Sequence, residues 1–231
     1  MTTTQPDIFG VIQGAFRDAW PLMRSRMTVY WVLALICGAL VLVALALGRL
    51  ADSSLQESVR IETAIQPANL CGVIAAFFAI PAIVRTVQPE FKMTFIRILA
   101  VIGIGLVVGV VAELGLFLLI VPGIWFGVKL SLSTWTYLVS EDKNPFGEAW
   151  EITTGHFWET FGFLFVLSIL VTLVTIVVFF IPVCVAIFVP VSAVVLTPLA
   201  FLGYMYVYHV ASLGEMRWML ELRRLASGAV T

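Results

Sequence analysis

The chain has 231 residues, of which 61% are hydrophobic and only 12% are charged, and its mean hydropathy is +1.06. Soluble globular domains carry about 25% charged residues, because their surface must be compatible with water. The composition therefore excludes an ordinary soluble domain, a disordered chain and a disulfide scaffold, and it predicts an integral membrane protein. The net charge of −1 provides no basic field for a polyanion, so nucleic acid is excluded as a partner.

Apolar runs long enough to cross a bilayer recur along the chain, since a hydrocarbon core about 30 Å thick needs about 20 apolar helical residues. We predict an all-α bundle with six transmembrane helices, over residues 29–48, 70–86, 96–120, 124–140, 161–181 and 191–213. A Val-Pro-Gly sequence at 121–123 separates the third span from the fourth, because proline cannot continue a helix and glycine permits a sharp turn. Pro182 and Pro190 bracket a second turn, whose apolar residues 183–189 are expected to dip back into the interface.

The lysine and arginine residues of the loops and of the span ends predict the orientation. With the N-terminus inside, ten of them fall on the inner side and only two, Arg49 and Arg60, on the outer side. This bias places both termini and a tail at 214–231 in the cytoplasm, and we expect the bacterial cytoplasmic (inner) membrane as the location.

Two further segments have the pattern of amphipathic helices that lie in the membrane interface, at residues 7–26 and 144–158. In the second, Asn144 is expected to cap the N-terminus and Pro145 suits the first turn. Both contain the pattern F-x-[D/E]-A-W, at 16–20 and 146–150, which is either a parallel repeat or a chance similarity. The residues expected to contact lipid at the interface are Arg17, Trp20, Arg24, Arg26, Trp150 and Trp158.

One stretch of the sequence resembles a known family. The segment FLLIVPGIW at 117–125 is followed by Lys129, by Glu141 and by PFGEAWEITTGHFW at 145–158. This pattern resembles the membrane domain attached to some glycerophosphoryl diester phosphodiesterases, together with its free-standing bacterial relatives. The resemblance implies a membrane architecture. No segment is long enough for the phosphodiesterase domain, so no catalytic residue is carried over.

Two ionisable residues fall near the middle of predicted spans, Glu113 in the third and Lys129 in the fourth. Inserting such a group into lipid costs about 2.5–3.5 kcal/mol, so its presence in a span calls for a structural or functional explanation. At about 1.5 Å per residue from the predicted turn, their depths differ by about 3 Å, which is within side-chain reach. A polar stripe continues from Lys129 through Ser133, Thr136 and Ser140. Two interpretations stay open: a structural ion pair, or a polar cavity for a proton, an ion or a lipid headgroup.

Near the end of the sixth span lie Tyr204, Tyr208 and His209, and Arg217 follows just after it. The tyrosines suit an aromatic belt at the membrane surface, and the four residues together suit a headgroup site. For His209 we expect a tyrosine or carbonyl partner.

The sequence contains none of the common catalytic or metal-binding motifs. Cys37, Cys71 and Cys184 lie in apolar runs and are interpreted as small apolar residues. We therefore predict a non-catalytic membrane protein without cofactor or metal, which organises lipid or a membrane partner and has membrane lipids, a membrane protein or further copies of itself as partners. The alternatives are a small transporter or channel that uses Glu113 and Lys129, and thirdly an intramembrane enzyme.

Overall fold

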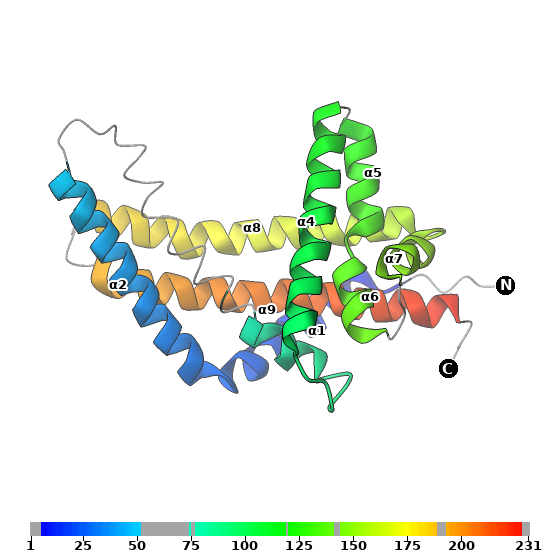
Figure 1. Cartoon of the computed structure of the whole chain (residues 1–231), viewed down its shortest axis with the longest axis horizontal. Coiled ribbons are helices and arrows are strands. Elements are labelled where there is room, and N and C mark those ends of the chain that lie inside the picture. Colours follow the sequence, from blue (N-terminus) through cyan, green and yellow to red (C-terminus); the bar gives the residue numbers. More distant parts are fainter. Residues whose placement is uncertain are drawn as a thin grey trace. The chain divides into compact units, whose positions relative to one another are not determined.

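The computed structural model describes residues 6–51, 74, 77–118, 120–140, 144–188 and 193–227. Over these ranges all regular elements are helical, which confirms the all-α class (Figure 1). The helices are α1 (Ile8–Arg24), α2 (Met27–Ala51), α4 (Phe95–Leu118), α5 (Ile120–Leu130), α6 (Ser133–Val139), α7 (Pro145–Thr153), α8 (Phe157–Phe188) and α9 (Ala193–Ala226). Residues 77–84 are also helical, and the remainder of the predicted second span lies mostly outside the described residues.

The chain forms two compact units, which are described separately. The first unit contains the described residues within Met1–Asp18, Pro81–Ile169 and Val210–Thr231. The second contains those within Ala19–Ile80 and Leu170–His209.

In the first unit, α4 and α5 form an antiparallel hairpin, and α6 and α7 pack beside its open end (Figure 1). The hairpin turns earlier than predicted, because α5 already begins at Ile120 and includes Pro122 and Gly123. The expectation of a helix stop at 121–123 is therefore wrong. Pro122 is the third residue of α5, where the missing N–H costs nothing, because the first four amides of a helix have no intrahelical acceptor.

The predicted fourth span, 124–140, is two helices in the structure. Helix α5 ends at Leu130, residues 131–132 form a turn, and α6 begins at Ser133. The hydroxyl of Ser131 donates to the carbonyl oxygen of Val128 at 2.9 Å. Such a local bond offers the backbone an alternative to the regular helical ladder, and the helix is interrupted at this point.

Helix α7 ends sooner than the predicted segment 144–158. Its start is as expected, since the side chain of Asn144 accepts a hydrogen bond from the amide of Gly147 and Pro145 is the first helical residue. Its end is set by Gly155, whose φ of +97° lies in the region that favours glycine. The chain turns there and α8 begins at Phe157, so Trp158 belongs to α8.

Helices α8 and α9 are both longer than predicted. Helix α8 passes through Pro182 to Phe188, so the turn expected over 183–189 is helical as far as it is described. Helix α9 continues to Ala226, which makes most of the expected tail 214–231 helical. The continuation is packed: the rings of Trp218 and Phe163 stack with centroids 4.7 Å apart, and the Trp218 indole donates to Thr160 at 3.2 Å.

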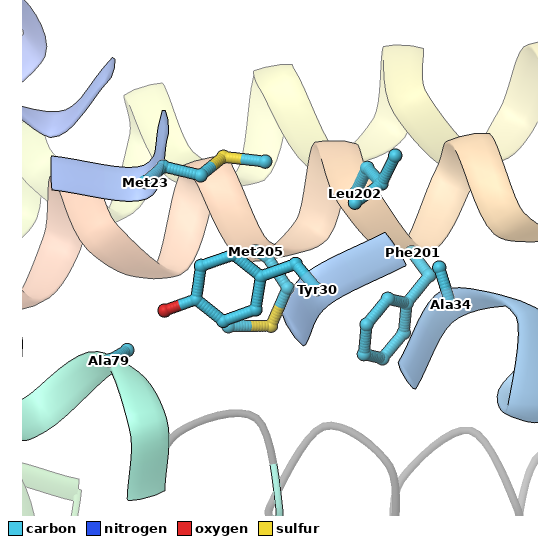
Figure 2. Packing of buried hydrophobic residues seen from close by; sticks show 7 residues of the cluster. All are labelled: Met23, Tyr30, Ala34, Ala79, Phe201, Leu202 and Met205. Carbon is cyan, nitrogen blue, oxygen red and sulfur yellow. The ribbon is translucent and has the colours of Figure 1, made fainter. Parts of the chain in front are cut away.

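In the second unit, a buried cluster joins the end of α1, α2, the helical residues 77–80 and the part of α9 before Val210. Its buried members are Met23, Tyr30, Ala34, Ala79, Phe201, Leu202 and Met205 (Figure 2). Most are apolar, and the ring of Tyr30 is completely buried among them. A buried hydroxyl must find a hydrogen-bond partner, and that of Tyr30 is described below.

Helix α1 has the predicted amphipathic pattern, but its apolar face is largely covered by protein. Ile12, Ala19 and Met23 from that face are buried. Phe9 and Trp20 remain 76% and 50% exposed. The helix therefore packs on one side against the chain and presents two aromatic rings on the surface.

Candidate functional site

The first unit contains a buried lysine enclosed by aromatic rings. Lys129 lies next to the C-terminus of α5 and is only 4% exposed. Its Nζ lies 5.9 Å from the ring centroid of Trp125 and 5.4 Å from that of Trp150, and it donates to Oγ1 of Thr154 at 2.8 Å. The two indoles meet edge to face at 4.7 Å. We call Trp125, Lys129, Trp150 and Thr154 the Lys129 cage.

Helix α7 and the turn after it supply half of the cage. Thr154 caps the C-terminus of α7, and its hydroxyl donates to the carbonyl oxygen of Trp150 at 2.6 Å. The hydroxyl hydrogen is thus directed back along α7, which leaves an oxygen lone pair for Lys129. The packing of α5 against α7 brings this acceptor to Lys129.

The charge of Lys129 is only partly balanced. An ammonium group has three N–H donors, and Thr154 accepts one of them. No carboxylate in the described part of the chain lies within 4.0 Å of this nitrogen. Cation–π contacts contribute about 0.5–2 kcal/mol each, whereas the effective penalty for burying an ion is several kcal/mol. The cage is therefore a buried cation that lacks a counter-charge among the described residues.

The expected partner, Glu113, does not pair with Lys129 in the described structure. Glu113 lies on the exposed surface of α4, and Lys129 donates its hydrogen bond to Thr154. The prediction compared only the distances of the two residues from the predicted turn, and these distances do not determine the direction in which the side chains point. The end of α5 and the position of α7 decide that direction.

The predicted polar stripe is mostly used in packing. The Thr136 hydroxyl lies 2.9 Å from the carbonyl oxygens of both Ser133 and Pro145, which links α6 to the start of α7. Ser140 donates its backbone N–H to the oxygen of Thr136 at 2.8 Å. Ser133 is fully buried, and its hydroxyl lacks a hydrogen-bond partner. Apart from Lys129, the described residues of the stripe thus mostly contact their own or neighbouring helices.

The two copies of the F-x-[D/E]-A-W pattern make similar contacts. Asp18, in the first copy, forms an ion pair with Arg217 of α9. Glu148, at the same position of the second copy, forms an ion pair with Arg223 of α9. The sequence shows an acidic residue at the third position of each copy and arginines near the C-terminus, but it does not predict which of them pair. The pattern thus marks two acid–arginine contacts with one helix.

The Asp18 carboxylate also accepts a hydrogen bond from Nε of its neighbour Arg17 at 2.9 Å. The hydrogen bonds from Arg17 and from Arg217 lower the pKa of Asp18 to about 2. Both Asp18 and Arg217 keep about a third of their side chains exposed, so solvent screens the pair. Arg17 and Arg217, which were expected at lipid headgroups, therefore have a protein partner.

His209 also has protein partners, as expected. It is fully buried, with Nδ1 2.7 Å from the carbonyl oxygen of Met205 and Nε2 3.1 Å from the hydroxyl of Tyr30. A carbonyl only accepts, so Nδ1 carries the hydrogen, and in the neutral ring Nε2 accepts from Tyr30. Tyr204 is partly exposed and Tyr208 is half-buried, and both make further interactions. His209 and Arg217 thus serve internal contacts in place of the expected headgroup site.

Of the remaining residues expected at the lipid interface, Trp158 is 75% exposed at the start of α8. Trp20 is half exposed and meets Tyr206 edge to face at 6.4 Å. Arg24 is exposed and Arg26 is partly exposed. These four side chains remain available to surroundings outside the protein.

Comparison with protein-family models, curated proteins and solved structures finds no match. The resemblance to the phosphodiesterase-associated membrane domain therefore stays an expectation drawn from residues 117–158. Among the described side chains, no group of three or more His, Cys, Asp and Glu residues is arranged to hold a metal ion.

Proposed function

We propose that this chain is a multi-pass protein of the bacterial cytoplasmic membrane that organises lipid or a membrane partner and catalyses no reaction. The proposal rests on one observation: the described structure leaves long apolar helices exposed. The segments Phe95–Gly115 of α4 and Phe157–Val178 of α8 are long and apolar enough to cross a membrane, and very few of their residues are buried.

The exposed side chains of α4 are large and apolar. Leu106, Val110 and Leu114 are 64%, 53% and 55% exposed. On a water-soluble protein, a contiguous apolar surface of this kind is rare, and an apolar core helix is covered by its neighbours. In a membrane, lipid removes the free-energy cost of exposing these side chains to water, because it solvates them as well as a protein interior does. The remaining spans of the predicted six, and the orientation with both termini inside, extend this proposal from the hydropathy and the positive charges.

A role with lipid is supported by the surface of the described residues. The exposed rings of Trp20 and Trp158 suit the headgroup region, where amphipathic aromatic rings concentrate. Arg24, at the end of α1, is exposed and provides positive charge for anionic lipid. The Lys129 cage adds a second cationic position. A transport function would need Glu113 and Lys129 in one polar pathway, and no described contact joins them.

The topology is tested by cysteine labelling. In a variant with Cys37, Cys71 and Cys184 replaced by alanine, Ser54→Cys and Ser227→Cys provide one reporter in the first predicted outer loop and one near the C-terminus. We expect a membrane-impermeant maleimide to label Ser54→Cys in intact spheroplasts and to label Ser227→Cys only after lysis.

Alkaline carbonate extraction of the wild-type chain is the companion measurement. We expect the chain to remain with the membranes. Release into the supernatant, or labelling of both cysteines in intact spheroplasts, would contradict the proposal.

A further inference from the structure

Helix α1 keeps part of its apolar surface uncovered. Ile12 and Ala19 are buried by the protein, whereas Phe9 is 76% exposed and Trp20 is 50% exposed. The two exposed rings are eleven residues apart, which is about three full helical turns, so they lie on the same side of α1. The apolar surface of the helix therefore consists of a strip against the protein and, beside it, an uncovered edge with Phe9 and Trp20. We call this the aromatic edge of α1.

The polar residues of α1 begin next to the aromatic edge. Arg17 and Arg24 are exposed, and their positions in the sequence place them about 60–80° further round the helix than Phe9. Asp7 is also exposed and lies nearly opposite Phe9. In a helix that lies in the membrane interface, the aromatic rings point towards the acyl chains, the arginines beside them reach the phosphate groups, and the acids face water. The side chains of α1 follow this order round the helix.

The first turn of α1 lies against the exposed side of α8. A Cβ atom added at Gly162 would lie 3.9 Å from Cδ1 of Ile8, so the two helices are in contact there. The residues at helical spacing around this glycine are exposed, namely Trp158 at 75%, Phe165 at 56% and Ile169 at 44%. The first turn of α1 is therefore on the surface of α8 that the proposed function assigns to lipid.

The contacts of α1 also give its depth. Gly162 follows Phe157, the first residue of the apolar segment of α8, by five residues, or about 7.5 Å along the helix axis. Interfacial amphipathic helices bury their apolar face by about 5–10 Å, which agrees with this position. Further along α1, Asp18 forms its ion pair with Arg217, which follows the predicted sixth span. Both contacts place α1 at the cytoplasmic ends of spans.

We infer that α1 lies in the cytoplasmic leaflet with its aromatic edge inserted among the acyl chains of phospholipids and with Arg24 at the level of their phosphate groups. Phospholipid is the occupant of this edge, because the edge adjoins the exposed apolar surface of α8 and carries positive charge beside it. The inference rests on the proposed membrane location and names the surface of α1 that contacts lipid. The strip with Ile12 and Ala19 binds the protein, so only the aromatic edge contacts the membrane.

The test measures which side of α1 contacts lipid. In the variant without the three native cysteines, a nitroxide spin label is attached at Phe9→Cys, Trp20→Cys or Arg17→Cys, and the full chain is reconstituted in vesicles of phosphatidylglycerol and phosphatidylcholine. Electron paramagnetic resonance compares collisions of the label with oxygen, which concentrates among acyl chains, and with a water-soluble nickel chelate. Arg17→Cys is the matched control, because the Arg17 side chain is 79% exposed, as Phe9 is, but lies on the polar side of α1.

We expect the ratio of oxygen to nickel collisions at Phe9→Cys and Trp20→Cys to exceed that at Arg17→Cys severalfold, because a polar chelate is excluded from the acyl chains. Replacing the exposed Phe9 should leave the fold intact. Equal ratios at the three positions would overturn the inference. Few collisions with either reagent at Phe9→Cys and Trp20→Cys would mean that protein, such as a second copy of the chain, covers the edge, and would overturn it as well.

A label at Leu106→Cys separates this inference from the proposed function. Leu106 is 64% exposed and belongs to the apolar segment of α4 that is proposed to cross the membrane. A high oxygen-to-nickel ratio at Leu106→Cys with low ratios at Phe9→Cys and Trp20→Cys would contradict the lipid contact of α1 alone. A low ratio at Leu106→Cys would contradict the membrane-spanning proposal itself.

Discussion

The approach of α4 to α5 gives the sharpest stability prediction, through Gly115→Ala. A Cβ atom at Gly115 would lie 2.6 Å from Cα and 3.0 Å from the backbone nitrogen of Gly123. Ordinary contacts begin at 3.4 Å, so the two helices must separate by about 0.8 Å, and no rotamer change relieves a clash with backbone. Overpacking of this kind costs about 1–3 kcal/mol, and alanine returns up to about 1 kcal/mol of helix propensity. We expect a net loss of about 1–2 kcal/mol.

Gly109→Ala is the matched control, because it makes the same change in the same helix and its Cβ would meet nothing within 4 Å. This control should be neutral or stabilising by up to about 1 kcal/mol. Thermal unfolding of the full chain in detergent, followed by circular dichroism, measures both. A chain of this size shifts by about 2–4 °C per kcal/mol, so Gly115→Ala should lower the Tm by about 2–8 °C. Equal Tm values for the two variants would refute the close approach of the helices.

Three further variants test individual contacts. Asp18→Asn should lower the stability by about 0.5–1 kcal/mol, a modest amount because the ion pair is partly exposed. Since the pKa of Asp18 is lowered to about 2, its carboxylate stabilises the fold above about pH 4. In a series of Tm measurements, the difference between wild type and variant should vanish as the pH falls to about 2. Tyr30→Phe should cost about 1–2 kcal/mol, because it leaves Nε2 of His209 buried without a partner, and an unchanged Tm would contradict that hydrogen bond. Gly155→Ala should cost about 1–2 kcal/mol through its φ of +97° alone, whereas Gly127→Ala, which also enters open space but within a helix, should not lower the Tm.

Hydropathy and periodicity predicted several helices closely. The expected segments 7–26, 29–48 and 96–120 correspond to α1, α2 and α4, and their ends differ by a few residues. Each has either a long apolar run or an apolar stripe at helical spacing. These signals are local, so they do not depend on how the rest of the chain packs.

Proline was the main source of error in the predicted boundaries. Pro122 and Pro182 were both interpreted as helix ends, and both lie inside helices. Proline is compatible with the first turn, as at Pro122, and it is tolerated within long apolar helices. Which of these situations applies depends on where the helix begins. Helix α5 begins at Ile120, two residues before Pro122, and its Gly123 lies close against Gly115 of α4.

The sequence by itself determined that this chain is helical, rich in apolar helix surface and without a catalytic or metal motif, because composition and spacing carry that information locally. Only the tertiary structure decided the partners of the charged and polar side chains. Lys129 bonds to Thr154 and Asp18 to Arg217, contacts that span 25 and 199 residues of sequence. Their choice depends on where α7 and α9 pack, and no local pattern encodes the direction in which a side chain points after distant helices have come together.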